Sequence, residues 1–430
     1  MRALAEYLAA SWQLSPLGRE LLSAGLILLT AIVVFAVALL IAALLTWLER
    51  RVAGRVQSRV GPNRVGPLGL LQWLADGLKM ILKEDVVPAA ADRPLFLLAP
   101  YPVMIGVFAA FATVPFSQLL IAADLDVGVL YLIAVTSLVV VGILMAGWGS
   151  NNKWSLLGGI RSAAQIVAYE VPAALALLSV VVMAGTLSLQ SIVAAQGGWP
   201  WEWYLLRTPF GFVAFFIYFT AAVAEGNRTP FDLPEAESEL VAGYNTEYSG
   251  IRFGGFFLGE FANIYLMSAI ASALFFGGWQ IPGVTPAEQV GSVWWQALGF
   301  LVFVAKAGVG CLVVILLRWT FPRLRVDQLT ALCYRYLAPG AFLCLVGNAL
   351  WIVLVPAGSL FERMVGYGMT AVAAALGLWF VLRMRRHMVS TGDRLDLDLF
   401  ARGHTRAAFD PAWQARAYGR FRRRRPGEAS

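Results

Sequence analysis

Residues 224–260 read AEGNRTPFDLPEAESELVAGYNTEYSGIRFGGFFLGE and form one polar stretch between two long apolar runs. The stretch holds seven acidic side chains and two basic ones: Glu225, Asp232, Glu235, Glu237, Glu239, Glu247 and Glu260, with Arg228 and Arg252. Charged groups gathered where helices enter a membrane are costly, so they usually serve ions or a polar ligand. A merely solvated loop is the alternative, but Glu260 lies inside the second apolar run, which favours a functional site.

Composition indicates a polytopic membrane protein. Hydrophobic residues make up 59% of the 430 residues and charged residues only 14%, whereas soluble domains are about 25% charged. The three cysteines are dispersed, and the two histidines, His387 and His404, lie near the C-terminus. No C-x-x-C or nucleotide-binding motif appears, so we expect this chain alone to bind no haem, metal, cluster, flavin or nucleotide. We also expect no nucleic-acid partner, because the basic run near the C-terminus is a short appendage to a membrane protein.

Nine apolar runs predict membrane spans, and the first of them is long enough to cross about 30 Å of hydrocarbon as a helix. They cover residues 21–48, 95–121, 127–148, 166–185, 210–224, 253–277, 295–319, 337–355 and 365–384. The expected fold class is therefore all-α, a polytopic transmembrane helical bundle of about nine spans. The first run lacks the layout of a cleaved signal peptide, so we expect it to be retained and to end at the charged residues Glu49, Arg50 and Arg51.

An amphipathic segment follows the first span. Residues 51–67 contain two Gly-Pro pairs, which predict turns. In residues 68–84 the polar side chains Gln72, Asp76, Lys79 and Lys83 share one helical face, and leucines and isoleucines cover the other. The segment is too short to span, so we expect an interfacial helix in the headgroup plane; packing on a soluble partner is the alternative.

The distribution of Lys and Arg predicts the orientation. With the N-terminus outside, only Arg2, Arg19, Arg207 and Arg363 lie outside, and nearly all other basic residues are cytoplasmic. The central acidic loop then faces the cytoplasm. Residues 1–384 form the membrane domain and residues 385–430 a basic cytoplasmic tail. The four arginines at 422–425 suit lipid headgroups, or simply a solubilising end.

Four ionisable residues lie within spans or at their edges: Glu170, Glu225, Glu260 and Lys306. The three glutamates fall in the cytoplasmic part of the bilayer at staggered depths, which predicts a shared proton path. The alternative is a set of neutral, hydrogen-bonded carboxyl groups that hold helices together. Lys306 is either their counter-charge or paired elsewhere, and the sequence leaves this open.

Four segments resemble the membrane-arm, quinone-site subunit of bacterial NADH:quinone oxidoreductase, respiratory complex I. They are ERRVAGRVQSRVGPNRVGPLGLLQ, GGIRSAAQIVAYEVP, AEGNRTPFDLPEAESELVAGYNTEYSG and FPRLRVDQL, within residues 40–355. The resemblance implies a multi-pass protein of the bacterial plasma (inner) membrane, which joins peripheral-arm and membrane-arm subunits. It also implies that quinone is the substrate and that FMN and iron–sulfur clusters reside in partner subunits. Residues 1–384 would then be the quinone-channel and proton-path domain.

The resemblance also implies roles for individual residues. The implied quinone-binding residues are Glu49, Arg50, Arg59, Asp76, Arg228 and Asp232. The implied proton-path residues are Glu170, Glu225, Glu235, Glu237, Glu239, Glu247 and Glu260. Arg323, Arg325 and Asp327 match a partner-facing motif. The family core has eight spans, so the ninth span and the basic tail depart from it and have no implied role.

Two other functions remain open at this stage. The first is the related membrane subunit of an energy-converting hydrogenase, which uses protons as the electron acceptor. The Gly-Pro segment and amphipathic helix favour quinone instead. The second is a self-contained ion transporter, for which the acidic loop is large and no pair of interrupted helices is evident.

Overall fold

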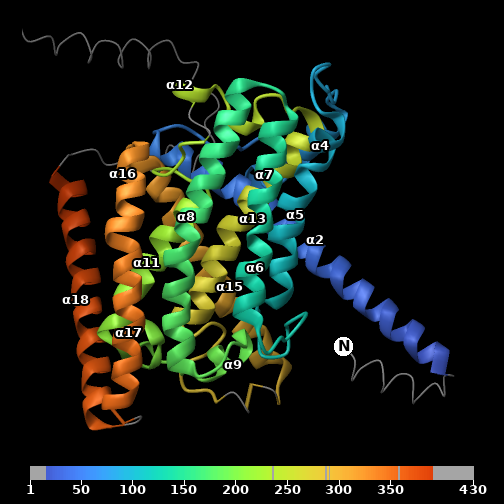
Figure 1. Ribbon diagram of the computed structural model, residues 1–430. Helices are drawn as coiled ribbons and strands as arrows, with labels where there is room; N and C mark the ends of the chain where they lie inside the picture. The colour runs from blue at the N-terminus through green and yellow to red at the C-terminus, as the bar shows by residue number, and fades with distance from the viewer. Residues whose placement is uncertain (1–15, 235–236, 286–287, 290, 357–358, 391–430) are drawn as a thin grey trace, which may run out of the picture. The chain divides into compact units, whose positions relative to one another are not determined.

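The structure is a computed structural model that describes residues 16–234, 237–285, 288–289, 291–356 and 359–390. Residues up to 371 form one compact unit and those from 372 a second. The described residues contain helices and no strand. The longer helices are α2 (Pro16–Val56), α5 (Pro100–Ala110), α7 (Leu138–Gly149), α8 (Lys153–Ala184), α11 (Pro209–Glu225), α13 (Gly250–Phe275), α15 (Val293–Thr320), α17 (Ala338–Leu354) and α18 (Leu360–Ser390) (Figure 1).

Short elements complete the chain between these helices. The α-helical ones are α3 (Gln72–Leu82), α4 (Arg93–Leu98), α6 (Gly128–Thr136), α9 (Leu189–Ala194), α10 (Tyr204–Arg207), α12 (Glu237–Leu240) and α16 (Val326–Ala331). The 3-10 turns are η1 (Pro67–Gly69), η2 (Phe111–Thr113), η3 (Pro200–Glu202) and η4 (Gly243–Asn245), and η5 (Leu332–Leu337) is a π-helical turn.

The predicted class, a helical membrane bundle, is confirmed. Eight stretches of the described residues are long and apolar enough to cross a membrane, and α11, with 17 residues, is a further apolar helix. Together they match the nine predicted spans. The backbone of α18 runs on to Ser390, so most of the predicted basic tail, residues 391–430, lies outside the described part of the chain.

Several predicted span ends were wrong. The first helix, α2, does not stop at Glu49 but continues to Val56, because the charges at its end find partners within the fold. The second helical run ends at Thr113 and not near residue 121, because Val114 precedes a proline and adopts an extended conformation. The fourth, α8, starts earlier, where the Asn152 side chain accepts a hydrogen bond from the Trp154 amide at 3.0 Å.

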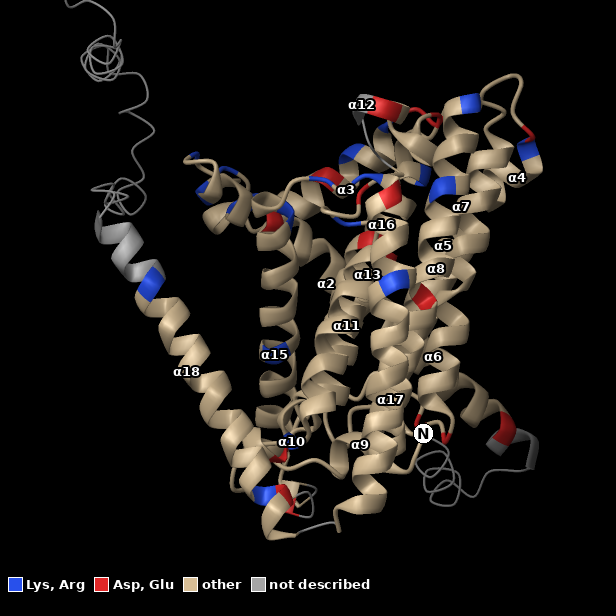
Figure 2. Cartoon of the chain, turned by 60° about the vertical axis from the view of Figure 1, so that its left-hand side comes forward, with Lys and Arg blue, Asp and Glu red and all other residues tan. Residues whose placement is uncertain are grey.

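Charged residues concentrate at one end of the first unit. Residues 57–92, 226–249 and 321–325 connect helices there, and this end is called the polar end below (Figure 1). Figure 2 shows Lys, Arg, Asp and Glu around α3, α4 and α12, while the middle parts of the helices carry few charges. Of the candidate spans, α13 is the most buried, and it packs against α2, α5, α11 and α15. It therefore runs through the centre of the site described next.

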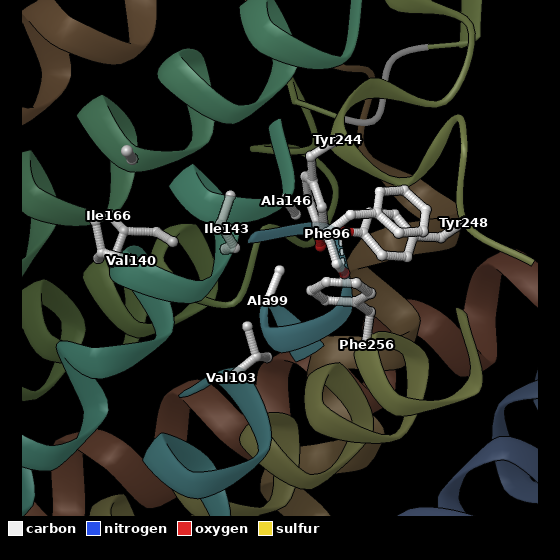
Figure 3. Close-up of a cluster of buried hydrophobic side chains, with 11 residues drawn as sticks. Phe96, Ala99, Val103, Val140, Ile143, Ala146, Ile166, Tyr244, Tyr248 and Phe256 are labelled. Carbon is white, nitrogen blue, oxygen red and sulfur yellow. Dashed lines mark hydrogen bonds between the residues drawn. The ribbon is translucent and has the colours of Figure 1, made fainter. Parts of the chain in front are cut away.

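An aromatic core anchors the loop before α13. The rings of Phe96 and Tyr248 stack with centroids 4.1 Å apart, and Phe256 meets the Tyr248 ring edge-on (Figure 3). The Tyr248 hydroxyl donates to the Phe96 carbonyl oxygen at 3.1 Å. Tyr244 belongs to the same cluster, which joins α4, α7 and α8 to α13. The cluster thereby fixes where Tyr244 meets the charged residues of α13.

Candidate functional site

Four charged side chains converge below the polar end, from α2, the loop after α11, α13 and α15. Glu49 accepts a hydrogen bond from Arg228 Nη1 at 3.3 Å and another from the Arg318 guanidinium. Arg228 Nη2 also lies 3.8 Å from Glu260 Oε2. The other oxygen of that carboxylate, Oε1, accepts a hydrogen bond from the Tyr244 hydroxyl at 3.0 Å. Buried charges are tolerated only when they are paired, and here two cations face two carboxylates. These four groups are called the charge quartet below.

The centre of the quartet is shielded from solvent. The side chains of Arg228 and Glu49 are only 6% and 9% exposed. The Arg228 guanidinium lies over the Phe261 ring, 4.4 Å from its centroid, which adds a cation–π contact. A charge introduced beside these groups is therefore felt strongly, because little water screens it.

The loop that carries Arg228 is held from α8 by a buried amide. Gln165 Nε2 donates to the carbonyl oxygens of Ala224 at 2.7 Å and Phe231 at 2.8 Å, and to Asn227 Oδ1 at 3.2 Å. The Asn227 amide in turn donates to Ser162 Oγ at 2.9 Å. Sequence reasoning missed Gln165, although an amide inside the apolar run of α8 is an unusual feature.

A cavity of about 330 Å³ adjoins the quartet. Its lining combines charged groups with aromatic rings and consists of Asn227, Arg228, Thr229, Asp232, Ala242, Asn245, Phe253, Phe257, Glu260 and Arg318. Such a lining suits a flat ligand with polar edges, because rings contact its faces while arginines donate to its oxygens. This space is called the chamber below.

Asp232 brings a titratable group to the chamber wall. Its carboxylate accepts from Arg323 Nη2 at 3.0 Å. Burial raises the pKa of the Asp232 carboxyl, while the adjacent Arg323 guanidinium lowers it and limits the rise. Arg325 and Asp327, the other residues of the partner-facing motif, are exposed at the polar end and do not line the chamber.

The amphipathic helix α3 is tied to the end of α2. Arg50 Nη1 and Asp76 Oδ2 form an ion pair at 2.5 Å, and the Gln72 amide donates to the same carboxylate at 3.3 Å. The opposite face is open: Leu78 is 53% exposed and Ile81 64%. Gln72 and Asp76 on the polar face are thus engaged, while Leu78 and Ile81 on the apolar face are exposed.

Two side chains of α2, one aromatic and one basic, fix the turn before α3. Arg51 Nη1 donates to the Leu68 carbonyl oxygen at 2.6 Å, and Trp47 Nε1 donates to the same oxygen at 3.3 Å. Arg59, in contrast, is exposed, and in the described part of the chain its guanidinium donates only to Gln57 Oε1, at 2.6 Å. The structure therefore does not bring Arg59 into the chamber.

Two small cavities lie between the helices, and the first shares Asn227 and Glu260 with the lining of the chamber. The first, about 20 Å³, is lined by Glu260 and Glu225 and also by Asn227, Tyr244 and Asn263 among its polar residues. The second, about 30 Å³, is lined by Glu225 and Glu170, with Tyr218 and Asn263. Glu260 thus borders the chamber and the first cavity, and Glu225 borders both cavities. The three intramembrane glutamates are brought together in one series.

The loop glutamates lie elsewhere. Glu239 is exposed and pairs with Arg161 at 2.8 Å, and Glu247 accepts from Asn152 Nδ2 at 2.7 Å. Neither lines the chamber or the two small cavities as described. Glu235 lies outside the described residues, and Glu237 is described only as the first residue of α12.

Lys306 does not serve as the counter-charge of the glutamates. Its Nζ donates to the carbonyl oxygens of Phe276 at 2.7 Å and Gly278 at 2.9 Å, and it lies over the Trp203 ring at 4.8 Å. These carbonyls close the end of α13 that is opposite the chamber. A cation at a helix C-terminus is stabilised by the helix dipole, so Lys306 anchors this end of α13.

The helix that carries Glu170 contains a proline two residues further on. Pro172 has no amide hydrogen, so the Ala168 carbonyl lacks its usual helical donor. The Cys333 thiol donates to that carbonyl oxygen at 3.1 Å, and the Tyr169 hydroxyl donates to the Leu329 carbonyl oxygen at 2.8 Å. Cys333 lies in the π-helical turn η5, so α8 and the π turn are joined beside Glu170.

No group of three His, Cys, Asp or Glu side chains able to hold a metal ion converges within the described ranges. The three cysteines there, Cys311, Cys333 and Cys344, are buried and free.

Comparisons with known proteins agree with this geometry. A family profile described as NADH dehydrogenase matches residues 29–349. A relative from Anaeromyxobacter dehalogenans, named as the H subunit of NADH-quinone oxidoreductase, is 52% identical over 377 residues, which cover 85% of this chain and 91% of that relative. Proteins of the same name from Chlorobium luteolum and Chlorobaculum tepidum are each 46% identical; the alignments cover 80% and 76% of this chain and 92% and 93% of the relatives.

The profile extends across the helices that carry the charge quartet and the three glutamates. Because the identity is high and the alignments cover more than nine-tenths of each relative, the resemblance noted in the sequence is confirmed. The chain belongs to the NADH dehydrogenase family, as an H subunit of NADH-quinone oxidoreductase, and is thus a membrane component of that enzyme complex, complex I.

Proposed function

We propose that this protein holds the quinone headgroup in the chamber and couples quinone reduction to proton movement through Glu260, Glu225 and Glu170. The observation that carries the proposal is the position of Glu260. It lines the chamber, it lies 3.8 Å from Arg228, and it also lines the first of the two small cavities. A change of charge in the chamber would therefore alter the electrostatic environment of Glu260, the first carboxyl group of the glutamate series.

The chemistry follows from the balance of quinone reduction. Quinone gains two electrons and two protons to become quinol, so negative charge develops on its oxygens before protons arrive. Arg228 and Arg318 are placed to stabilise that charge, and a guanidinium drawn toward it weakens its pairing with Glu49 or Glu260. A carboxylate that loses its cation binds a proton more readily, which gives a coupling step.

We further propose the path by which quinone arrives. Helix α3 presents exposed leucine and isoleucine side chains on one face while its other face is bound to α2 through Asp76 and Arg50. An amphipathic helix of this kind lies at the surface of the bilayer, at the level where a lipid-soluble quinone lifts its headgroup out. In this arrangement α3 borders the opening through which quinone leaves the lipid.

The partners and the orientation are proposals as well. The polar end, which carries most described charges, would face peripheral-arm subunits in the cytoplasm, with the exposed Arg325 and Asp327 at that contact. Electrons would reach quinone from an iron–sulfur cluster there, after NADH reduces FMN in another subunit. The N-terminus would lie outside and the C-terminus in the cytoplasm, with the bundle in the bacterial plasma membrane beside other membrane-arm subunits.

The proposal is tested by labelling the assembled complex with a photoreactive azidoquinone. We expect illumination to attach the label near Phe253 and Phe257, which line the chamber on α13, and excess unmodified quinone to suppress the attachment. Peptide mapping by mass spectrometry identifies the site. Competed labelling confined to other subunits, with α13 unlabelled, would contradict a quinone chamber in this chain.

The Asp232–Arg323 pair gives a pH-dependent expectation. Replacing Arg323 with glutamine removes the cation that lowers the Asp232 pKa, so burial raises that pKa further. If chamber function needs the ionised carboxylate, quinone reduction then declines at a higher pH on acidification than in the unaltered enzyme. The measurement is the rate of quinone reduction against pH, with Arg161→Gln at the polar end as the control. An unshifted acidic limb would show that Asp232 ionisation does not matter.

A further inference from the structure

Asn263 occupies a special position in the series of cavities. It lies on α13 three residues after Glu260, so the two side chains share one face of the helix. Among the described residues, Asn263 and Glu225 alone line both small cavities. Glu260 reaches only the first cavity and Glu170 only the second. Asn263 is thus present at each of the two gaps between neighbouring glutamates.

Each gap has the size and polarity that one water molecule needs. The cavities measure about 20 and 30 Å³, and a buried water requires roughly 10–15 Å³ measured in this way, with two to four polar partners. The first cavity offers Glu260, Glu225 and Asn263 as partners, and the second offers Glu170, Glu225 and Asn263. Carboxyl groups too far apart for direct transfer can exchange a proton through such a water.

The amide of Asn263 has its hydrogen-bonding capacity free for this task. It makes no hydrogen bond with another group in the described part of the chain. Tyr218, which lines the second cavity, is by contrast engaged, because its hydroxyl donates to the Met267 carbonyl oxygen at 3.1 Å. An amide offers two N–H donors and one acceptor oxygen, so one side chain can hold a water on each side. It does not titrate, so it orients water without storing a proton.

We propose that Asn263 is a positioning residue that holds one water in each cavity and so completes the connection from Glu260 through Glu225 to Glu170. The inference rests on the proposed function, because it assigns a further part to the same path. It adds a residue that is not ionisable, and that a search for intramembrane charges would pass over.

The test replaces Asn263 with leucine, which has a similar size but no polar atoms, in the assembled complex. We expect NADH-driven acidification of inverted vesicles and quinone reduction to fall together by about tenfold. The residual rate should show a larger solvent deuterium isotope effect, because proton transfer becomes limiting. Asn263→Ser, which keeps a hydroxyl and leaves room for water, should recover most of the activity and the original isotope effect. If the leucine variant does not assemble, Asn263→Val tests the same loss.

Controls separate this inference from the path itself. Ser268 lies on the same helix, donates to the Ile264 carbonyl oxygen at 2.9 Å and lines neither cavity, so Ser268→Ala should pump normally. Normal pumping by Asn263→Leu, with pumping lost in Glu225→Gln, would overturn the role of Asn263 and leave the path standing. Normal pumping by both would overturn the path. Equal loss in the leucine and serine variants, with an unchanged isotope effect, would indicate packing instead.

Discussion

Replacement of Arg228 with methionine should reduce NADH:quinone activity by at least about a hundredfold, while the complex still assembles and still passes electrons from NADH to a soluble acceptor. Methionine approximates the length of the side chain but removes the cation that both Glu49 and Glu260 face. In the proposed function Arg228 stabilises the negative charge that develops on the quinone oxygens. Removing one preorganised donor of this kind typically lowers a rate by about a hundredfold to a thousandfold, which sets the size of the expected effect.

The experiment needs two comparisons to be decisive. Arg161→Met removes an arginine that is paired at the polar end but is only half-buried, and it should leave quinone reduction unchanged. Arg228→Lys retains the charge but not the paired N–H groups of guanidinium, so it should give an intermediate rate. Activity with ferricyanide as acceptor and the amount of complex on a native gel are measured alongside. Loss of both activities in fully assembled Arg228→Met complex would contradict a local role at quinone.

Replacement of Glu225 with glutamine is expected to have the second largest effect. Glutamine keeps the shape of the side chain but cannot take up and release a proton, and Glu225 is the glutamate shared by both small cavities. Quinone reduction and proton pumping should therefore fall together by roughly tenfold or more, with assembly retained. Glu170→Gln and Glu260→Gln should act in the same direction, because each borders one of these cavities.

NADH-driven acidification of inverted membrane vesicles measures the pumping, and the quinone-reduction rate is recorded on the same preparation. Glu202→Gln, an exposed glutamate outside all three cavities, is the matched control and should behave as the unaltered enzyme. Near-normal pumping in all three single variants, and in the Glu225→Gln/Glu260→Gln double variant, would mean that these carboxyl groups hold helices together and carry no protons.

The sequence was informative where an ionisable residue interrupts an apolar run. Glu170, Glu225 and Glu260 were identified in this way, since the cost of placing a carboxylate in a membrane is visible from its neighbours alone. The amphipathic helix near Asp76 was likewise evident, because its polar residues repeat at helical spacing.

Pairing between distant segments was not visible in the same way. Glu49 and Arg318 are 269 residues apart, and nothing in either local sequence indicates that they meet. Gln165 supports the Arg228 loop by donating to backbone carbonyl oxygens. Every residue has such an oxygen, so the sequence does not indicate which ones Gln165 contacts. From the sequence, Lys306 could have paired with any of the carboxylates. In the structure it donates instead to the carbonyl oxygens of Phe276 and Gly278 at the end of α13. Such contacts are set by packing, so they require the folded structure.

The position of Pro172 within α8 bears on how the helix can bend. α8 is one helix from Lys153 to Ala184, but the Ala168 carbonyl accepts from the Cys333 thiol, a weak donor from another element, in place of a backbone amide. A helix bends most easily where a backbone hydrogen bond is missing, so we expect any bend of α8 to fall near Pro172, two residues from Glu170. A small bend there would change the spacing between Glu170 and Glu225 while the remaining backbone bonds stay intact. The distance between Glu170 and Glu225 across the second cavity can therefore change without the loss of further backbone hydrogen bonds.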